Sequence, residues 1–348
     1  MRPTLIAALC LIPLTAHAND GWGGVAATGL TFGQTDAVAM QEEDLFISRD
    51  KIRVDYLFKN LTDQDVTGEV IFPMPPINLT YFAQSDWNLP EDPSAADLAG
   101  FTATVNGADQ PITIDRIAVI EPPYDENAPL SQQYDTPGRD VTAEITALGL
   151  PLTLDYDAIT QALLAMTPAQ RAGAKAAGLA DFFEAGTGYP EEAVPMWSLI
   201  LRYHWAQTFP AGEEMRISHA YDNHAPGGIF AWEHPAPDYH QYEVDRYCID
   251  DGTSKALFDR LQNPELEPGT AMGIAYNIDY VLRTANSWAG PIGKFELTID
   301  KGEPENVISL CADGVKKTGP TTFVVEKTNY TPDRDLQILL AMPMSPAD

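Results

Sequence analysis

The chain is poor in cysteine, histidine and basic residues, and each shortage limits the partners and chemical sites that can be expected. Of 348 residues only 3 are cysteine and 6 are histidine, and 21 Lys and Arg stand against 50 Asp and Glu. A formal charge of −29 repels nucleic acid and anionic lipid, so neither is an expected partner. No apolar run long enough for a transmembrane segment, about 20 residues, follows the first eighteen.

Common catalytic motifs are missing as well. The sequence has no Gly-x-Ser-x-Gly, no Ser-x-x-Lys, no His-Glu-x-x-His and no glycine-rich phosphate loop. Pairs of carboxylates, as in glycosidases, carry no information among 50 acidic residues. The sequence therefore favours a protein that is not an enzyme.

The first eighteen residues are typical of a cleaved secretory signal. Arg2 precedes an apolar run at residues 5–15, and Ala16-His17-Ala18 is a small-x-small cleavage site. The run is too short to span a membrane. We therefore expect a signal peptide at residues 1–18 and a periplasmic or secreted mature protein.

Two cysteines follow the signal, Cys248 and Cys311. In an oxidising compartment an even pair most simply forms a disulfide, and we predict this bond. Two buried free thiols are the alternative. A bond that closes so long a loop stabilises a fold by roughly 4 kcal/mol if its geometry is unstrained.

Alternation of apolar and polar residues predicts strands. The longest example is residues 197–221, where the odd, mostly apolar positions of 197–205 and 215–221 share one face on the two sides of a turn at 209–212. Residues 51–73 repeat this design around a polar turn at 60–65. We interpret both segments as β-hairpins. Asn106-Gly107 is a further hairpin signal.

Helices are expected where the apolar period changes from two to about 3.6 residues. Asp155 or Asp157 can cap one helix, and Thr167-Pro168-Ala169-Gln170 is a capping box with Pro at the first helical position. A short helix is also expected at residues 254–261, capped by Asp251 or Thr253.

These patterns together predict a mainly β fold with two β-sandwich-like units and a small helical insertion. The expected division of the chain is a signal peptide at 1–18, an N-terminal β-sandwich part at 19–140, a helical insertion at 141–190, a β-hairpin and loop that complete the first sandwich at 191–240, and a C-terminal β-rich domain with a short helix at 241–348.

Several segments resemble one bacterial family. The most specific are Asn286-Ser287-Trp288-Ala289-Gly290-Pro291-Ile292 and residues 207–212. They resemble the uncharacterised secreted family called domain of unknown function 4424, and the likeness extends over nearly the whole mature chain. It implies an exported Gram-negative protein and carries over no catalytic residue. Phe58-Lys59-Asn60 with residues 68–75 also looks like one hairpin of the vault and inter-alpha-trypsin inhibitor type domain.

Histidines and acids are dense at residues 219–240. The metal-competent side chains that we single out are His219, Asp222, His224, His234 and His240. Imidazole and carboxylate suit zinc or another transition metal, although these spacings match no standard site. Solvated loop histidines or a strand-end hydrogen bond are the alternative. No cofactor other than such a divalent metal is expected.

Three aromatic residues are candidate ligand contacts: Trp288, Trp232 and Tyr203. Flat rings bury a large area at little cost in entropy, which suits a platform for a sugar or peptide. Trp288 lies in a predicted turn and is the best candidate for an exposed contact. Core packing is the alternative, because the alternating positions near Tyr203 are apolar.

These features favour an exported, non-enzymatic binding or structural protein of the cell envelope. Its partner, a small ligand or another envelope protein, is not specified by the sequence. The alternative is a metal-assisted hydrolase that uses residues 219–240. Three ligands around one point would favour the hydrolase, whereas an open groove would favour binding.

Overall fold

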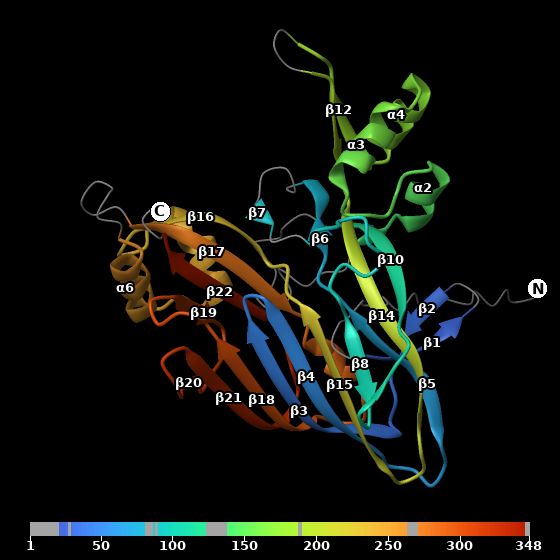
Figure 1. Cartoon of the computed structure of the whole chain (residues 1–348), viewed down its shortest axis with the longest axis vertical. Helices are drawn as coiled ribbons and strands as arrows, with labels where there is room; N and C mark the ends of the chain where they lie inside the picture. Colours follow the sequence, from blue (N-terminus) through green and yellow to red (C-terminus); the bar gives the residue numbers. More distant parts are fainter. Residues whose placement is uncertain are drawn as a thin grey trace, which may run out of the picture.

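The alternating segments form strands in the computed structural model of the chain (Figure 1). The structure describes residues 21–26, 29–80, 86–87, 90–122, 138–186, 190–262 and 271–344, so the predicted signal peptide lies outside it. The prediction of a mainly β fold is confirmed. The described strands form sheets of 7, 8 and 5 strands, which we name sheets A, B and C, and a small sheet of 2 strands.

Sheet A has the order β11-β10-β14-β5-β1-β2, with β6 beside β14. Its strands are β1 (Gly21–Ala26), β2 (Gly29–Phe32), β5 (Val66–Pro73), β6 (Ile77–Asn78), β10 (Thr113–Ile120), β11 (Arg139–Asp140) and β14 (Ser198–Phe209). All the pairings in it are antiparallel.

Sheet B has the order β20-β21-β18-β3-β4-β15-β8-β9. Its strands are β3 (Val38–Ser48), β4 (Lys51–Asn60), β8 (Thr102–Val105), β9 (Ala108–Asp109), β15 (Glu214–Asp222), β18 (Ile292–Asp300), β20 (Lys316–Lys317) and β21 (Thr322–Tyr330). Because β18 pairs in parallel with β3, strands from both ends of the chain share this sheet.

Sheet C has the order β19-β22-β17-β16-β7. Its strands are β7 (Asp86–Trp87), β16 (Pro226–Trp232), β17 (Ala271–Tyr280), β19 (Val307–Leu310) and β22 (Leu336–Pro343). Residues 336–341 are buried without alternation, because β22 is covered on both faces. One face belongs to the main core, and helices α5 (Gln241–Tyr247) and α6 (Asp251–Arg260) cover the other.

Sheets A and C both contribute to the core on the inner face of sheet B. Phe72 of sheet A lies 4.5 Å, between ring centroids, from His219 of sheet B and 6.2 Å from Tyr280 of sheet C. The hydroxyl of Tyr280 lies 3.3 Å from that of Tyr56 in β4. The two sandwich-like units therefore share sheet B and one hydrophobic core.

The prediction that residues 51–73 and 197–221 form β-hairpins is wrong. β4 and β15 belong to sheet B, whereas the strands that follow β4 and precede β15 along the chain, β5 and β14, belong to sheet A. Each segment is therefore an arch that crosses from one sheet to the other. A period of two fits both shapes, since the apolar faces of an arch meet across the core. The Asn106-Gly107 hairpin joins β8 to β9 as predicted, with φ of 48° and 80°.

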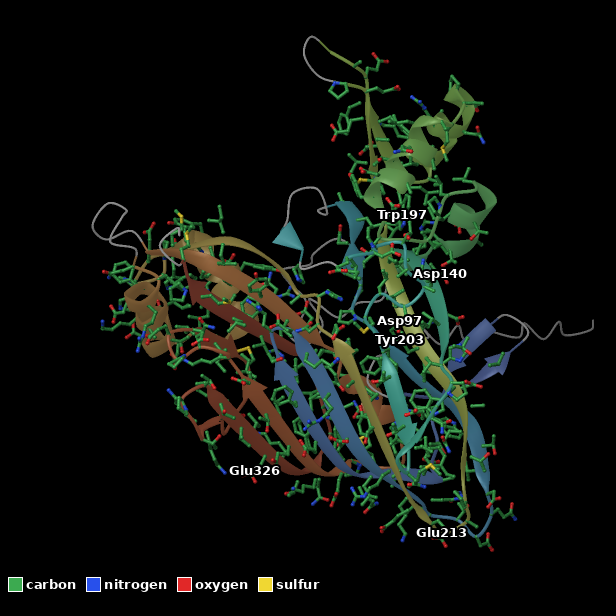
Figure 2. The ribbon with its side chains drawn as sticks, in the orientation of Figure 1. Asp97, Asp140, Trp197, Tyr203, Glu213 and Glu326 are labelled. Carbon is green, nitrogen blue, oxygen red and sulfur yellow. A yellow bond between two sulfur atoms is a disulfide. The ribbon has the colours of Figure 1, made fainter. Side chains whose placement is uncertain are left out.

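Asn60 ties the two arches together. Its side-chain amide donates to the carbonyls of Gln64 (2.8 Å) and Phe209 (2.9 Å), and its side-chain oxygen accepts from the backbone N–H of Thr62 (2.9 Å). Its own N–H donates to the carbonyl of Glu213, which lies at the lower tip of the β14–β15 arch in Figure 2. The fully buried side chain of Asn60 thus satisfies backbone hydrogen-bonding groups of two turns that are far apart in the sequence.

The helical insertion stands at one end of sheet A (Figure 1). It contains α2 (Thr142–Ala147), α3 (Tyr156–Leu164), α4 (Pro168–Ala176) and the 2-stranded sheet of β12 (Ala180–Phe183) and β13 (Glu192–Pro195). Asp155 caps α3, and the capping box of Thr167 and Gln170 begins α4, as predicted. No helix among the described residues is long and apolar enough to cross a membrane.

Candidate functional site

A pocket of about 440 Å³ lies where helix α6 meets the ends of sheets B and C. It is lined by Asp250, Gly252, Thr253, Ala256, Arg260, Lys301, Pro304, Asn306, Val307, Ile308, Lys317 and Phe323. Its walls come from one helix, the connection between β18 and β19, and the β20–β21 hairpin. Sites for small molecules commonly measure about 300–1,000 Å³.

Helix α6 is held by its cap and by one apolar face. Asp250 accepts from the N–H of Thr253 at 2.7 Å, and the pKa of Asp250 is lowered chiefly by this hydrogen bond. The cap is Asp250 rather than the expected Asp251 or Thr253. Leu257 and Leu261 are buried in a cluster with Trp232 of sheet C. The polar flank that carries Arg260 therefore faces the pocket.

The predicted disulfide is confirmed, and it lies beside the pocket. Cys248 precedes α6 and Cys311 follows β19, with an S–S distance of 1.95 Å and a sequence separation of 63. The hydroxyl of Ser309 also donates to the carbonyl of Tyr247 at 2.9 Å. The covalent bond and this hydrogen bond fix two walls of the pocket to each other.

Lys301 is a buried cation in the pocket wall. Its residue is 6% exposed, and its ammonium donates to the carbonyls of Pro304 (2.6 Å) and Asn306. The amide of Asn306 donates back to the carbonyl of Lys301 at 2.7 Å. Burial lowers the pKa of Lys301, and the nearby charges of Lys317 and Arg260 lower it further.

Two further cations line the pocket. Arg260 pairs with Glu305, and Lys317 lies 5.7 Å from the centroid of the Phe323 ring. Within the described residues, Lys301 and Lys317 form no salt bridge, whereas the adjacent Lys316 pairs with Glu326 at 2.8 Å. A strongly acidic chain thus concentrates positive charge at one concave place.

The three candidate ligand contacts are buried: Trp288 is 3% exposed, Trp232 1% and Tyr203 0%. The expected exposure of Trp288 is wrong, because the turn that carries it packs onto the arches, where its ring lies 4.5 Å from that of Phe58. The hydroxyl of Tyr203 donates to Asp97 at 3.0 Å (Figure 2). A ligand contact by any of the three stays a prediction.

His219 is separated from the other candidate metal ligands by its place in the core. It is 2% exposed and is surrounded by the rings of Tyr56, Phe72, Phe101 and Tyr221. Burial lowers its pKa to about 3, so the imidazole is neutral at physiological pH. Asp222, at the end of the same strand, pairs with Lys51 at 2.9 Å.

The remaining candidate metal ligands lie along the chain after β15. His224 lies in the loop before β16, His234 is 3.1 Å from the hydroxyl of Ser254, and the ring of His240 packs 4.6 Å from Trp232. In the described part of the chain, no group of three or more His, Cys, Asp or Glu side chains is placed to hold a metal ion. A metal at residues 219–240 stays a prediction.

A second hollow, of about 430 Å³, lies on the outer face of sheet A. Its lining combines two arginines, Arg116 and Arg202, with three acids, Asp115, Asp140 and Glu144. Arg202 is 3.5 Å from Asp115, and desolvation lowers the pKa of Arg202. The pocket beside α6 has three cations and one acid, Asp250, in its lining and is therefore the better site for an anion.

This pocket could not be predicted from the sequence. Arg260, Lys301 and Lys317 are scattered over nearly sixty residues and match no motif. The one usable signal is indirect: basic residues are few, so three that converge are informative once the fold is known.

The architecture defines a class of mainly β proteins in which two sandwiches share one central sheet. The chain belongs to the family described as Domain of unknown function (DUF4424), whose model matches residues 18–339. The resemblance noted from the sequence is thereby confirmed. No curated protein matches the chain.

Solved structures show only distant likeness. One, from Legionella pneumophila subsp. pneumophila strain Philadelphia 1, is provisionally described as a nutrient binding protein. It shares 15% identity at a TM-score of 0.41, over 92% of this chain and 72% of that one. Another is an M1 zinc metallopeptidase of Deinococcus radiodurans with a Tyr-Ser-Ala substrate. It shares 8% identity at a TM-score of 0.24, over 89% of this chain and 44% of that one.

Proposed function

We propose that this chain is an exported, non-enzymatic binding protein of the cell envelope that holds a small solute in the pocket beside α6. The observation that supports this function most directly is the pocket itself. It has the volume of a small-molecule site and combines cationic, hydrogen-bonding and apolar side chains.

The walls of the pocket support binding because they are fixed before any solute arrives. The disulfide joins the segment between α5 and α6 to the residue that follows β19. Lys301 and Asn306 hold each other through two hydrogen bonds, and the ammonium of Lys301 also donates to the carbonyl of Pro304. A preorganised site loses little entropy when a ligand enters. Asp250, the acid in the lining, is occupied as a helix cap.

Export is supported by two independent features. Residues 1–18 have the pattern of a cleaved signal, and Cys248 and Cys311 form a disulfide, a bond that persists in oxidising compartments. The strongly acidic composition suits a protein that remains dissolved among other envelope components.

The experiment is to express the full chain with its own signal in a Gram-negative host and to recover it from the periplasm. Native mass spectrometry of the purified protein should show a shorter chain, begun near residue 19, with a bound small molecule. The matched control is Ala256→Trp, which fills the pocket from α6 and should carry no solute. Retention in the cytoplasm, or equal solute on both proteins, would contradict the proposal; capture of a protein partner alone would favour a structural role.

A further inference from the structure

The geometry points to a ligand class for this pocket: an organic anion whose acidic group is held by Arg260, Lys301 and Lys317 and whose apolar body lies against Phe323 and Ile308. This inference rests on the proposed function and adds to it the chemistry of the solute.

The first step concerns charge. Acids outnumber bases by 50 to 21, so a surface cation of this chain has many carboxylates available. Among the described residues Arg260 pairs with Glu305, whereas Lys301 and Lys317 form no salt bridge. The lining itself holds three cations against one acid, Asp250. Such an excess of like charge is costly, and an entering anion reduces that cost. Burial lowers the pKa of Lys301, and the charges of Lys317 and Arg260 lower it further.

The second step concerns hydrogen-bond donors. The ammonium of Lys301 has three N–H groups, and two carbonyls, of Pro304 and Asn306, accept from it. No third acceptor for this ammonium is present among the described residues, and Lys301 lines the pocket. The guanidinium of Arg260 presents a planar fork that suits a carboxylate or phosphate. Lys317 is exposed and provides charge at the rim.

The third step concerns the apolar part of the lining. Ala256, Val307, Ile308 and Phe323 supply aliphatic and aromatic surface next to the cations. A bare inorganic anion would leave this surface in contact with water. An anion with a small apolar body would cover it and gain hydrophobic stabilisation in proportion to the area buried.

The test uses three probes that share one ring and differ in charge: phenyl phosphate, benzyl alcohol and benzylammonium. Binding to the full exported protein is measured by isothermal titration calorimetry at low ionic strength. Phenyl phosphate should bind at least tenfold more tightly than the other two and at least tenfold more tightly than inorganic phosphate. Raising the salt concentration should weaken its binding.

Two matched double variants locate the site. Arg260→Ala with Lys317→Ala should weaken phenyl phosphate at least tenfold. Lys255→Ala with Lys316→Ala removes the same charge from the same helix and hairpin, outside the pocket lining, and should change the affinity less than twofold. Equal losses in both pairs would show that net charge alone attracts the probe and would overturn the site. Thermal unfolding of each variant shows that it is folded.

The outcomes separate this inference from the proposed function. Tighter binding of benzyl alcohol or benzylammonium, lost in Ala256→Trp, overturns the anionic class and leaves solute binding intact. Tighter binding of inorganic phosphate than of phenyl phosphate would contradict the inference that the ligand has an apolar body. If no probe binds, the ligand class is wrong, and the solute carried by the periplasmic protein then decides the proposed function independently.

Discussion

Two buried basic side chains, His219 and Lys301, occupy opposite kinds of environment. His219 lies among aromatic rings between sheets A and B, and burial keeps it neutral. Lys301 is almost as buried, yet carbonyls of Pro304 and Asn306 accept from its ammonium, and its wall opens to a pocket. His219 is therefore a neutral side chain of the core between sheets A and B, whereas Lys301 is a basic side chain in the wall of a pocket.

This difference teaches where stability and function reside in the chain. Sheets A and B are held together by buried apolar side chains and by the turns of the two arches. Substitutions there should therefore alter the free energy of unfolding. In the C-terminal region a disulfide ties the segment between α5 and α6 to the end of β19 in sheet C, and apolar side chains of both helices pack on that sheet. Its pocket residues should alter binding with little effect on stability. The predictions below probe this contrast.

The largest effect is expected from the disulfide. Replacing both Cys248 and Cys311 by serine should lower the free energy of unfolding by about 4 kcal/mol on the loop-entropy model, because the bond closes a long loop with a sequence separation of 63. Urea unfolding measures this loss. Hydrogen exchange should accelerate in α5 and α6 while amides of β4 and β15 remain protected; uniform acceleration would contradict the division into two regions.

At the turns that join sheets A and B, Asn60→Ala should lower the free energy of unfolding by about 3 kcal/mol, since it leaves several buried hydrogen-bonding groups without a partner. Urea denaturation provides the measurement. Gln64→Ala in the same turn is the control and should change stability by less than about 0.5 kcal/mol, because its side chain is exposed and its hydrogen bonds in the structure come from its backbone. Equal losses of stability in the two variants would show that the side chain of Asn60 does not link the two arches.

Lowering the pH should reduce the stability of the fold through the protonation of His219. Its pKa is about 3 in the folded chain against an ordinary value of 6.5, so the unfolded chain binds more protons between these values and stability falls as pH falls. The expected loss from pH 7 to pH 5 is about 2 kcal/mol. Urea unfolding of the wild type and of His219→Leu at both pH values checks it. An unchanged slope in the variant would assign the effect to other groups.

The smallest effect is expected on the exposed face of sheet B. Asp44 lies directly opposite Asp55 on one side and Glu296 on the other, and burial, then Glu296 and Asp55, raise its pKa. Asp44→Asn should stabilise the fold by about 0.5 kcal/mol, since like charges paired across strands repel. Thermal unfolding at low and high salt measures the gain, which salt should reduce. A loss would show that Asp44 has a favourable partner.

The sequence predicted individual elements better than their partners. The strands, the capped helices at Asp155 and Thr167, and the Asn106-Gly107 hairpin follow from local periodicity and turn chemistry, and all three kinds are present. The arches were mistaken for hairpins because alternation fixes which face is apolar and leaves open which sheet receives the next strand. Helix α5 was missed, since it is only 7 residues long and weakly patterned.

The disulfide shows how far composition can reach. Only Cys248 and Cys311 follow the signal pattern, so an oxidising compartment leaves one intramolecular pairing. Trp288 shows the opposite case. A tryptophan in a turn has the same sequence context whether it is exposed or, as here, packed against Phe58, and only the neighbours that the fold brings to it decide.

The sequence by itself determined a mainly β chain with an acidic composition, a helical insertion, one disulfide and membership in a family of unknown function, because these depend on local pattern, composition and motif. The tertiary structure alone decided that both arches cross between sheets and that Arg260, Lys301 and Lys317 meet in one pocket. These contacts join residues far apart along the chain, and their energies arise only once sheets B and C and helix α6 have packed together.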